Sequence, residues 1–192
     1  MVSTNLLPGL ITLHMLLAVL IVFVIIYAVA RHRPVLSEKM IPSASRSVHY
    51  WLIGAIILSV VQVALGTQVR EAIDEIARQL GEARRDSWVN NLGISFYIHR
   101  SFSLLVLFVH GYLIYRLQQN NFYKNKIIHK NIVFLLVLLI LEILSGVGMA
   151  YFNIPAFLQP LHLLLAIIVI RYTVLHPFSI EPTPAFTGEP KS

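Results

Sequence analysis

The sequence predicts an all-α integral membrane protein whose chain crosses the bilayer five times, and two observations carry this prediction. Of 192 residues, 57% are hydrophobic and only 12% are charged, whereas a soluble domain carries about 25% charged residues. Apolar residues also form uninterrupted stretches of about 20 residues, the length that an α-helix needs to cross the hydrocarbon core. Lipid satisfies no backbone polar group, so each stretch is expected to be helical. The stretches are residues 6–30, 50–69, 94–115, 132–152 and 156–175.

The first stretch is expected to stay in the protein as a membrane helix. No Lys or Arg precedes it, it lacks a small-residue cleavage site, and it is longer than the apolar region of a secretory signal. We assign residues 1–47 to this helix and the loop that follows it.

The placement of Lys and Arg predicts an external N-terminus and a cytoplasmic C-terminus. Basic residues gather in the loops after the first and third spans, whereas the four Arg residues between the second and third spans are outnumbered by acidic residues. The net charge of +6 is therefore explained by topology. No basic stripe with interleaved aromatics is present, so nucleic acid is not an expected partner.

Residues 48–176 are predicted to form an antiparallel four-helix bundle, with an external amphipathic segment over residues 70–93 and a disordered cytoplasmic tail over residues 177–192. Within the external segment, apolar residues recur at helical spacing opposite a charged face, which predicts an amphipathic helix over residues 71–85 at the outer surface. A solvated helical loop is the alternative. The apolar positions are Ile73, Ile76, Ala77 and Leu80.

Depth in the membrane sorts the eight histidines into two groups. Four lie at cytoplasmic span ends, where a structural role is expected; these are His32, His49, His129 and His176. Among those inside spans, His14, His99 and His162 each fall about five residues after an external start, which places them at a shared depth of roughly 7 to 9 Å. His14 and His162 also lie in nearly identical segments, residues 13–18 and 161–166.

Two histidines at one depth on parallel helices provide the geometry for bis-histidine ligation of a haem iron between the helices. The alternative is a set of buried polar residues that are hydrogen-bonded to neighbouring helices. We favour the cofactor, because ionisable residues inside a membrane are functional by default. The chain contains no cysteine, so it cannot bind the iron through a thiolate, and imidazole is the expected ligand.

His110 follows His99 by 11 residues, so both project from one face of the same helix. A second haem between His110 and His176 is an alternative, but His176 lies just before Pro177 and is poorly placed. We expect His110 to be a packed or hydrogen-bonding residue.

The second and fourth spans echo each other, because each has a polar residue four positions before a glycine. The pairs are Gln62 with Gly66, and Glu142 with Gly146. Glycine allows a neighbouring backbone or a flat cofactor to approach closely. Glu142 is expected to contact a cofactor or a proton path, or else to form an interhelical hydrogen bond.

Together these motifs resemble the C-terminal four-helix half of haem A synthase, whose members oxidise a methyl group of haem O to the formyl group of haem A. The resemblance implies that His99 and His162 are axial ligands of a haem b and that Gly66, Gly146 and Arg100 contact the cofactor. His14 resembles one ligand of a second haem, in the N-terminal half, whose partner lies in a helix upstream. The matching segments are residues 62–70, 97–100, 142–146 and 161–166.

The chain departs from the family pattern at Phe96, where the N-terminal half of the family has a glutamate thought to be catalytic; no catalytic residue is therefore assigned. The chain resembles a fragment that is not active alone: either another polypeptide supplies the first three N-terminal helices, or the chain is a truncated product. Implied partners are the lipid bilayer, haem, haem O synthase and cytochrome oxidase assembly factors, in a bacterial plasma membrane. The alternatives are a cytochrome b-like electron carrier and a membrane interaction module with structural histidines.

Overall fold

Helices are the only regular elements in the part of the chain that the structure, a computed structural model, describes: residues 13–14, 16–22, 24–25, 28, 46–119 and 126–178. This confirms the predicted all-α fold class. The long helices are α2 (Arg46–Leu80), α3 (Ile94–Gln119), α4 (Lys126–Tyr151) and α5 (Leu158–Phe178), and two short 3₁₀ helices, η1 (Glu82–Ser87) and η2 (Val89–Asn91), join α2 to α3. The predictions for His32, the loop after the first span and the tail beyond residue 178 lie outside the described residues.

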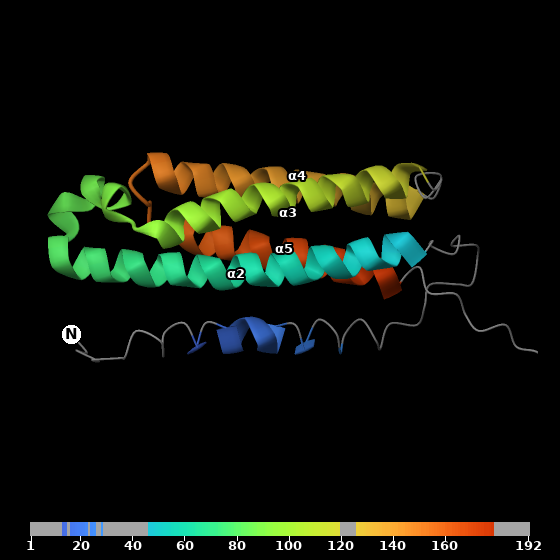
Figure 1. The fold of residues 1–192 in the computed structure, drawn as a ribbon, viewed down its shortest axis with the longest axis horizontal. Helices are drawn as coiled ribbons and strands as arrows, with labels where there is room; N and C mark the ends of the chain where they lie inside the picture. The colour runs from blue at the N-terminus through green and yellow to red at the C-terminus, as the bar shows by residue number, and fades with distance from the viewer. Residues whose placement is uncertain are drawn as a thin grey trace, which may run out of the picture.

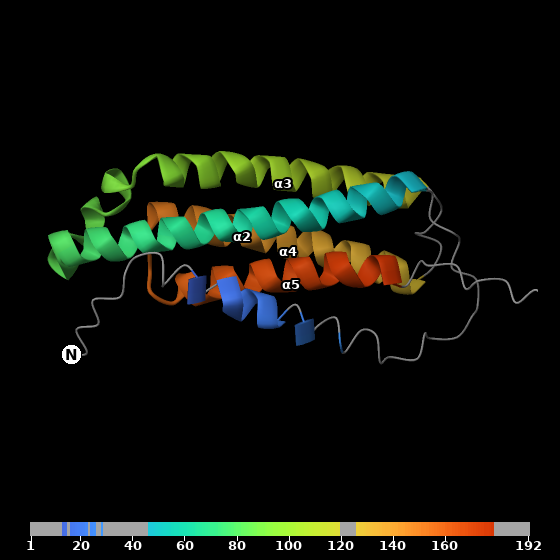
Figure 2. The ribbon, with the colours of Figure 1, turned by 60° about the horizontal axis from the view of Figure 1, so that its bottom comes forward.

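The four long helices alternate in direction and form an antiparallel bundle (Figures 1 and 2). Helix α2 packs against α3 and α5, while α4 packs against α5 and, less extensively, against α3. Helices α3 and α5 consequently run in the same direction, as the predicted topology requires.

Among the described residues, three helical stretches are long and apolar enough to cross a membrane: Ser47–Leu80, Ile94–Gln119 and His129–Tyr151. A shorter apolar helix covers Leu158–Thr173. Large apolar side chains such as Ile57, Leu104 and Leu144 are exposed on the bundle surface, which suits contact with lipid tails. The chain is therefore an integral membrane protein.

The first predicted span is described only in part, so the total of five spans stays a prediction. Its described residues are helical over 16–22, and Val19 is buried against Val63 of α2 and Ile170 of α5. This helix therefore packs on the outside of the four-helix bundle, beside α2 and α5 (Figure 2).

The two halves of the bundle differ in packing. At the end where α2 begins, an apolar core includes Leu52, Leu113, Leu117 and Leu135, all almost completely buried. At the opposite end, the connection between α2 and α3 and the turn between α4 and α5 lie side by side (Figure 1). We call residues 81–93 the cap, and this end of the bundle the cap end.

The predicted amphipathic helix over residues 71–85 was wrong in its extent. Helix α2 runs without a break for 35 residues, about 52 Å, so residues 71–80 are its last turns. It ends at Leu80 because Gly81 adopts φ 72°, a left-handed conformation that glycine tolerates best. The apolar face itself was correctly located, since Ile73 is buried against Trp88, Leu92 and Ile154.

The cap is held to the α4–α5 turn by one arginine. Arg85 donates from Nε to the carbonyl oxygen of Asn153 (3.0 Å) and from Nη2 to that of Ile154 (2.5 Å). Its guanidinium also lies 4.9 Å from the centre of the Trp88 ring, a favourable cation–π arrangement. Both turn residues have positive φ angles, 57° and 54°, so these contacts fix an uncommon backbone conformation.

Candidate functional site

A cavity of about 510 Å³ opens between the four long helices towards the cap end of the bundle. All four helices contribute to its lining, and η2 and the α4–α5 turn also reach it. The lining includes the sequence-predicted residues Gly66, His99, Arg100, Glu142, Gly146 and His162.

His99 on α3 and His162 on α5 meet in this cavity. Their ring centroids are 6.4 Å apart and the ring planes are inclined at 79°. The structure thus brings together the two histidines that the sequence placed at one depth on parallel helices.

Each histidine ring lies against one of the two motif glycines. A Cβ atom on Gly66 would lie 3.2 Å from Cε1 of His99, and one on Gly146 would lie 3.3 Å from Cε1 of His162. Both distances are tighter than ordinary van der Waals contact. The absence of a side chain at these positions lets α2 and α4 approach the rings, and it makes the two halves of the site similar to each other.

The polar residue of each motif also reaches the histidine of its own half, but the contacts differ. Gln62 donates from Nε2 to the backbone oxygen of His99 (3.1 Å). Glu142 instead places Oε1 3.3 Å from Nδ1 of the His162 ring. Glu142 therefore contacts the imidazole of His162 directly, whereas Gln62 contacts only the backbone of His99.

Ser145 adds a contact that the sequence analysis missed. Its Oγ lies 2.8 Å from Nδ1 of His162 and 2.8 Å from the backbone oxygen of Glu142. Its place three residues after Glu142 was the available signal, because residues three apart share one face of a helix. A serine is common in membrane helices, so the spacing alone did not distinguish it.

Three buried polar atoms near the rings have no hydrogen-bond partner among the described residues. They are Oε1 of Gln62, Nδ1 of His99 and Oε2 of Glu142. Buried polar atoms are nearly always paired in native proteins, so their clustering here makes this cavity the candidate binding site.

The cavity is polar towards the cap and apolar at depth. Arg70 lies in its lining, bonded to Asp74 (2.8 Å) and to the side-chain oxygen of Gln159, and Arg100 lies on the facing helix. At the opposite extremity the lining consists of Val106, Leu107, Leu139 and Ala166. The sequence placed Arg70 in the external segment and at the end of the matching segment 62–70, but predicted no cofactor contact for it.

His110 and His14 lie outside this cavity. His110 is fully buried, with Nδ1 2.9 Å from the backbone oxygen of Val106 and Nε2 3.3 Å from Oγ1 of Thr173. Both ring nitrogens are therefore engaged, as expected for a hydrogen-bonding residue. His14 is an exposed residue of the first helix, and its role at a second site stays a prediction. His176 belongs to α5, but its side chain lies outside the described residues.

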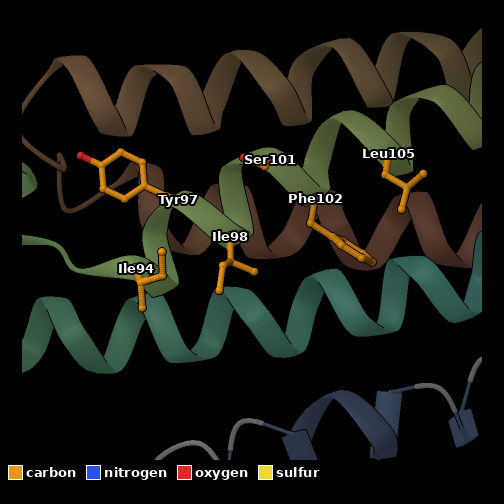
Figure 3. A pocket seen from close by; sticks show the side chains of 6 residues that line it. All are labelled: Ile94, Tyr97, Ile98, Ser101, Phe102 and Leu105. Atoms are coloured by element: carbon orange, nitrogen blue, oxygen red, sulfur yellow. The ribbon is translucent and has the colours of Figure 1, made fainter.

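A second hollow follows the exposed face of α3 (Figure 3). It is lined by Ile94, Tyr97, Ile98, Ser101, Phe102 and Leu105. Its lining contains no carboxylate, amine or imidazole, and its polar groups are the hydroxyls of Tyr97 and Ser101. In the described part of the chain, the central cavity included, no cluster of three or more His, Asp or Glu residues could hold a metal ion.

Comparison with known protein families gives a match over most of the chain. The family model described as cytochrome oxidase assembly protein, COX15-CtaA, matches residues 1–174. No curated protein and no solved structure matches the chain.

Proposed function

The chain belongs to the COX15-CtaA family of cytochrome oxidase assembly proteins, the haem A synthase family, and we propose that its four-helix bundle holds a haem b for haem A synthesis. His99 and His162 are the proposed axial ligands. His14, on the first helix, is proposed to serve a second haem, the substrate haem O or its product haem A.

The observation that carries this proposal is the pair of imidazoles that meet across the cavity. A metal ion lies about 2 Å from each imidazole nitrogen that binds it, and ring centroids 6.4 Å apart leave room for one ion between the rings. The unpaired Nδ1 of His99 and the glycine beside each ring fit a site that is completed by a bound group.

The lining supports a porphyrin in particular. A porphyrin has flat apolar faces and two carboxylates at one edge, and the cavity has apolar walls with Arg70 and Arg100 in its lining. The two guanidinium groups are suited to bind these carboxylates by charge-assisted hydrogen bonds. When bound, haem b supplies one-electron transfer at its iron.

The cavity lining contains one carboxylate, and it does not lie at the position of Phe96, where the chain departs from the family pattern. Phe96 lines the cavity, and its phenyl ring neither accepts nor donates a proton. Glu142 is the one carboxylate of the lining and is engaged with His162. We therefore propose that the bundle passes electrons, and that conversion of haem O to haem A needs residues beyond those of this cavity.

We also propose that the cap end faces the outside of the membrane, as the charge pattern predicts, and that the partners are those of cytochrome oxidase assembly, with haem O synthase and a polypeptide bearing further helices among them. A cytochrome b-like electron carrier is the second candidate. It is favoured by Phe96, whose phenyl ring lines the cavity and offers no acid–base group.

An absorption spectrum of the purified full chain, loaded with haem b in detergent and reduced, tests the haem site. We expect a b-type α-band that His99→Ala and His162→Ala abolish, while His49→Ala, at an exposed position of α2, and His110→Gln retain it. The ligand assignment would be contradicted if the parent chain took up no haem b, or if the His110 variant lost the band.

Supplying haem O to cells that express the chain, followed by chromatography of extracted haems, separates the two candidates. We expect no haem A from the chain alone and haem A when a polypeptide with the N-terminal helices is co-expressed. Continued absence of haem A in the second case favours the electron carrier, whereas haem A from the chain alone would refute the proposed division of roles.

A further inference from the structure

The two histidine rings of the site differ in the hydrogen-bond partners of their Nδ1 atoms. In the α4–α5 half, Nδ1 of His162 has two oxygen neighbours, Ser145 Oγ at 2.8 Å and Glu142 Oε1 at 3.3 Å. In the α2–α3 half, Nδ1 of His99 is buried and has no partner among the described residues.

The hydroxyl proton of Ser145 decides the direction of the shorter contact. Ser145 Oγ lies 2.8 Å from the backbone oxygen of Glu142, which can only accept. A hydroxyl has one proton, so a Ser145 that donates to this carbonyl must accept from Nδ1 of His162. Glu142 Oε1 can accept the same proton, either as a carboxylate oxygen or as the carbonyl oxygen of a neutral carboxyl group.

A neutral imidazole carries one proton, and the hydrogen bond made by one nitrogen leaves the other free to bind a metal. We infer that Ser145 and Glu142 are positioning residues that hold His162 in the tautomer protonated at Nδ1, so that Nε2 is its ligand atom. This use of Nε2 rests on the proposed haem site, whereas the tautomer follows from the hydrogen bonds alone.

In the α2–α3 half, no described side chain accepts a hydrogen bond from Nδ1 of His99. Gln62 donates from Nε2 to the backbone oxygen of His99, and its Oε1 has no partner among the described residues. His162 is therefore the ligand that the fold prepares in advance, and His99 is the ligand whose tautomer is set only when the group binds.

The first test measures the tautomer without haem, by nitrogen-15 NMR of histidine in the labelled full chain in detergent, with His162→Ala identifying the signal. We expect the His162 ring to be protonated at Nδ1 in the parent chain. In the double variant Ser145→Ala, Glu142→Leu, which removes both acceptors, the ring should exchange between tautomers. Ser145→Thr, which keeps the hydroxyl, and Ser59→Ala, which removes a buried serine on α2 that donates to Ala55, should preserve the parent signal.

The second test measures haem b affinity and the electron paramagnetic resonance spectrum of the ferric form. Loss of a partner that orients a metal ligand weakens metal binding about 10-fold or more. We expect this loss in the double variant, with an altered low-spin signal, and neither effect in Ser145→Thr or Ser59→Ala.

The outcomes separate the two claims. A parent chain that has the Nδ1-protonated ring but binds no haem defeats the proposed function and leaves the positioning role in place. A ring protonated at Nε2 in the parent chain, or an unchanged ring and affinity in the double variant, overturns the positioning role even if haem binds.

Discussion

Gly66 and Gly146 determine how closely α2 and α4 approach the two histidine rings. A methyl group at either position would lie 3.2 or 3.3 Å from a ring carbon, so the ring would have to move by a few tenths of an ångström. Since the two rings face one cavity at a defined separation, such a movement changes the site directly. Both glycines therefore serve the site by close approach, while their helices remain regular.

Gly66→Ala is expected to weaken haem b binding about five-fold. Turning a side chain away from its preferred rotamer costs about 1 kcal/mol, which corresponds to that change in affinity. The control is Gly54→Ala, because a Cβ at Gly54 has no neighbour within 4 Å and alanine favours helix by about 1 kcal/mol. Haem titration of both variants checks this, and equal affinities would show that the glycine contact is unimportant.

The contact between His110 and Thr173, both fully buried, joins α3 to α5 in the densely packed half of the bundle. Thr173→Val removes the hydroxyl at 3.3 Å from the imidazole and should lower the free energy of unfolding by about 1 kcal/mol. Unfolding in detergent by increasing denaturant measures this change. The haem spectrum should stay that of the parent chain, and a change in the spectrum would mean that His110 belongs to the haem site.

At the scale of elements, the cap closes the end of the bundle through Arg85. Its two hydrogen bonds reach the turn between α4 and α5, and Trp88 donates from its indole to the carbonyl of Gly81 (3.3 Å). The cap residues Val89 and Leu92 also line the cavity. Any opening of the cap therefore exposes the cavity to its surroundings.

Arg85→Ala is expected to loosen the cap. Loss of hydrogen bonds from a charged donor costs about 2 kcal/mol, which corresponds to an opening equilibrium about 30-fold more favourable. Hydrogen exchange of the backbone amides in η2 measures it. Arg78→Ala is the matched control, because the Arg78 side chain is 64% exposed in its pair with Glu75 and exposed pairs contribute little. Equal exchange in the two variants would contradict the role of Arg85.

Sequence patterns predicted the helices of the bundle well because length and hydropathy determine which segments cross a membrane. They failed in the cap, where α2 ends at Leu80 and not at residue 85, because the stop depends on the backbone angle of Gly81 and on contacts with a turn about 70 residues away. The charged residues after position 80 fit an exposed helix equally well, so their pattern contained no signal of this turn.

For the site, depth along parallel helices was sufficient to pair His99 with His162, and the glycine motifs indicated the helices that face them. Ser145 and Arg70 were not found, since each depends on which way a helix is rotated about its axis. Hydropathy fixes that rotation poorly when a helix is apolar on every face, as α4 and α5 are.

At the scale of the whole molecule, the bundle combines a densely packed half with a hollow half. Leu52, Leu113 and Leu135 fill the first half, and the cavity lies in the second. The pair α2–α3 and the pair α4–α5 each contribute one glycine, one motif polar residue and one histidine to that cavity. The fold thus places two similar helical hairpins around a single site, and the packed half holds their relative positions.

The central claim is that His99 and His162 bind the same iron, and electron paramagnetic resonance of the ferric, haem-loaded full chain tests it most directly. We expect a low-spin bis-imidazole signal from one haem b bound in the cavity of each chain. His99→Ala and His162→Ala should each convert it to a high-spin signal, and added imidazole should restore the low-spin form. A low-spin signal that survives in both single variants would contradict the account.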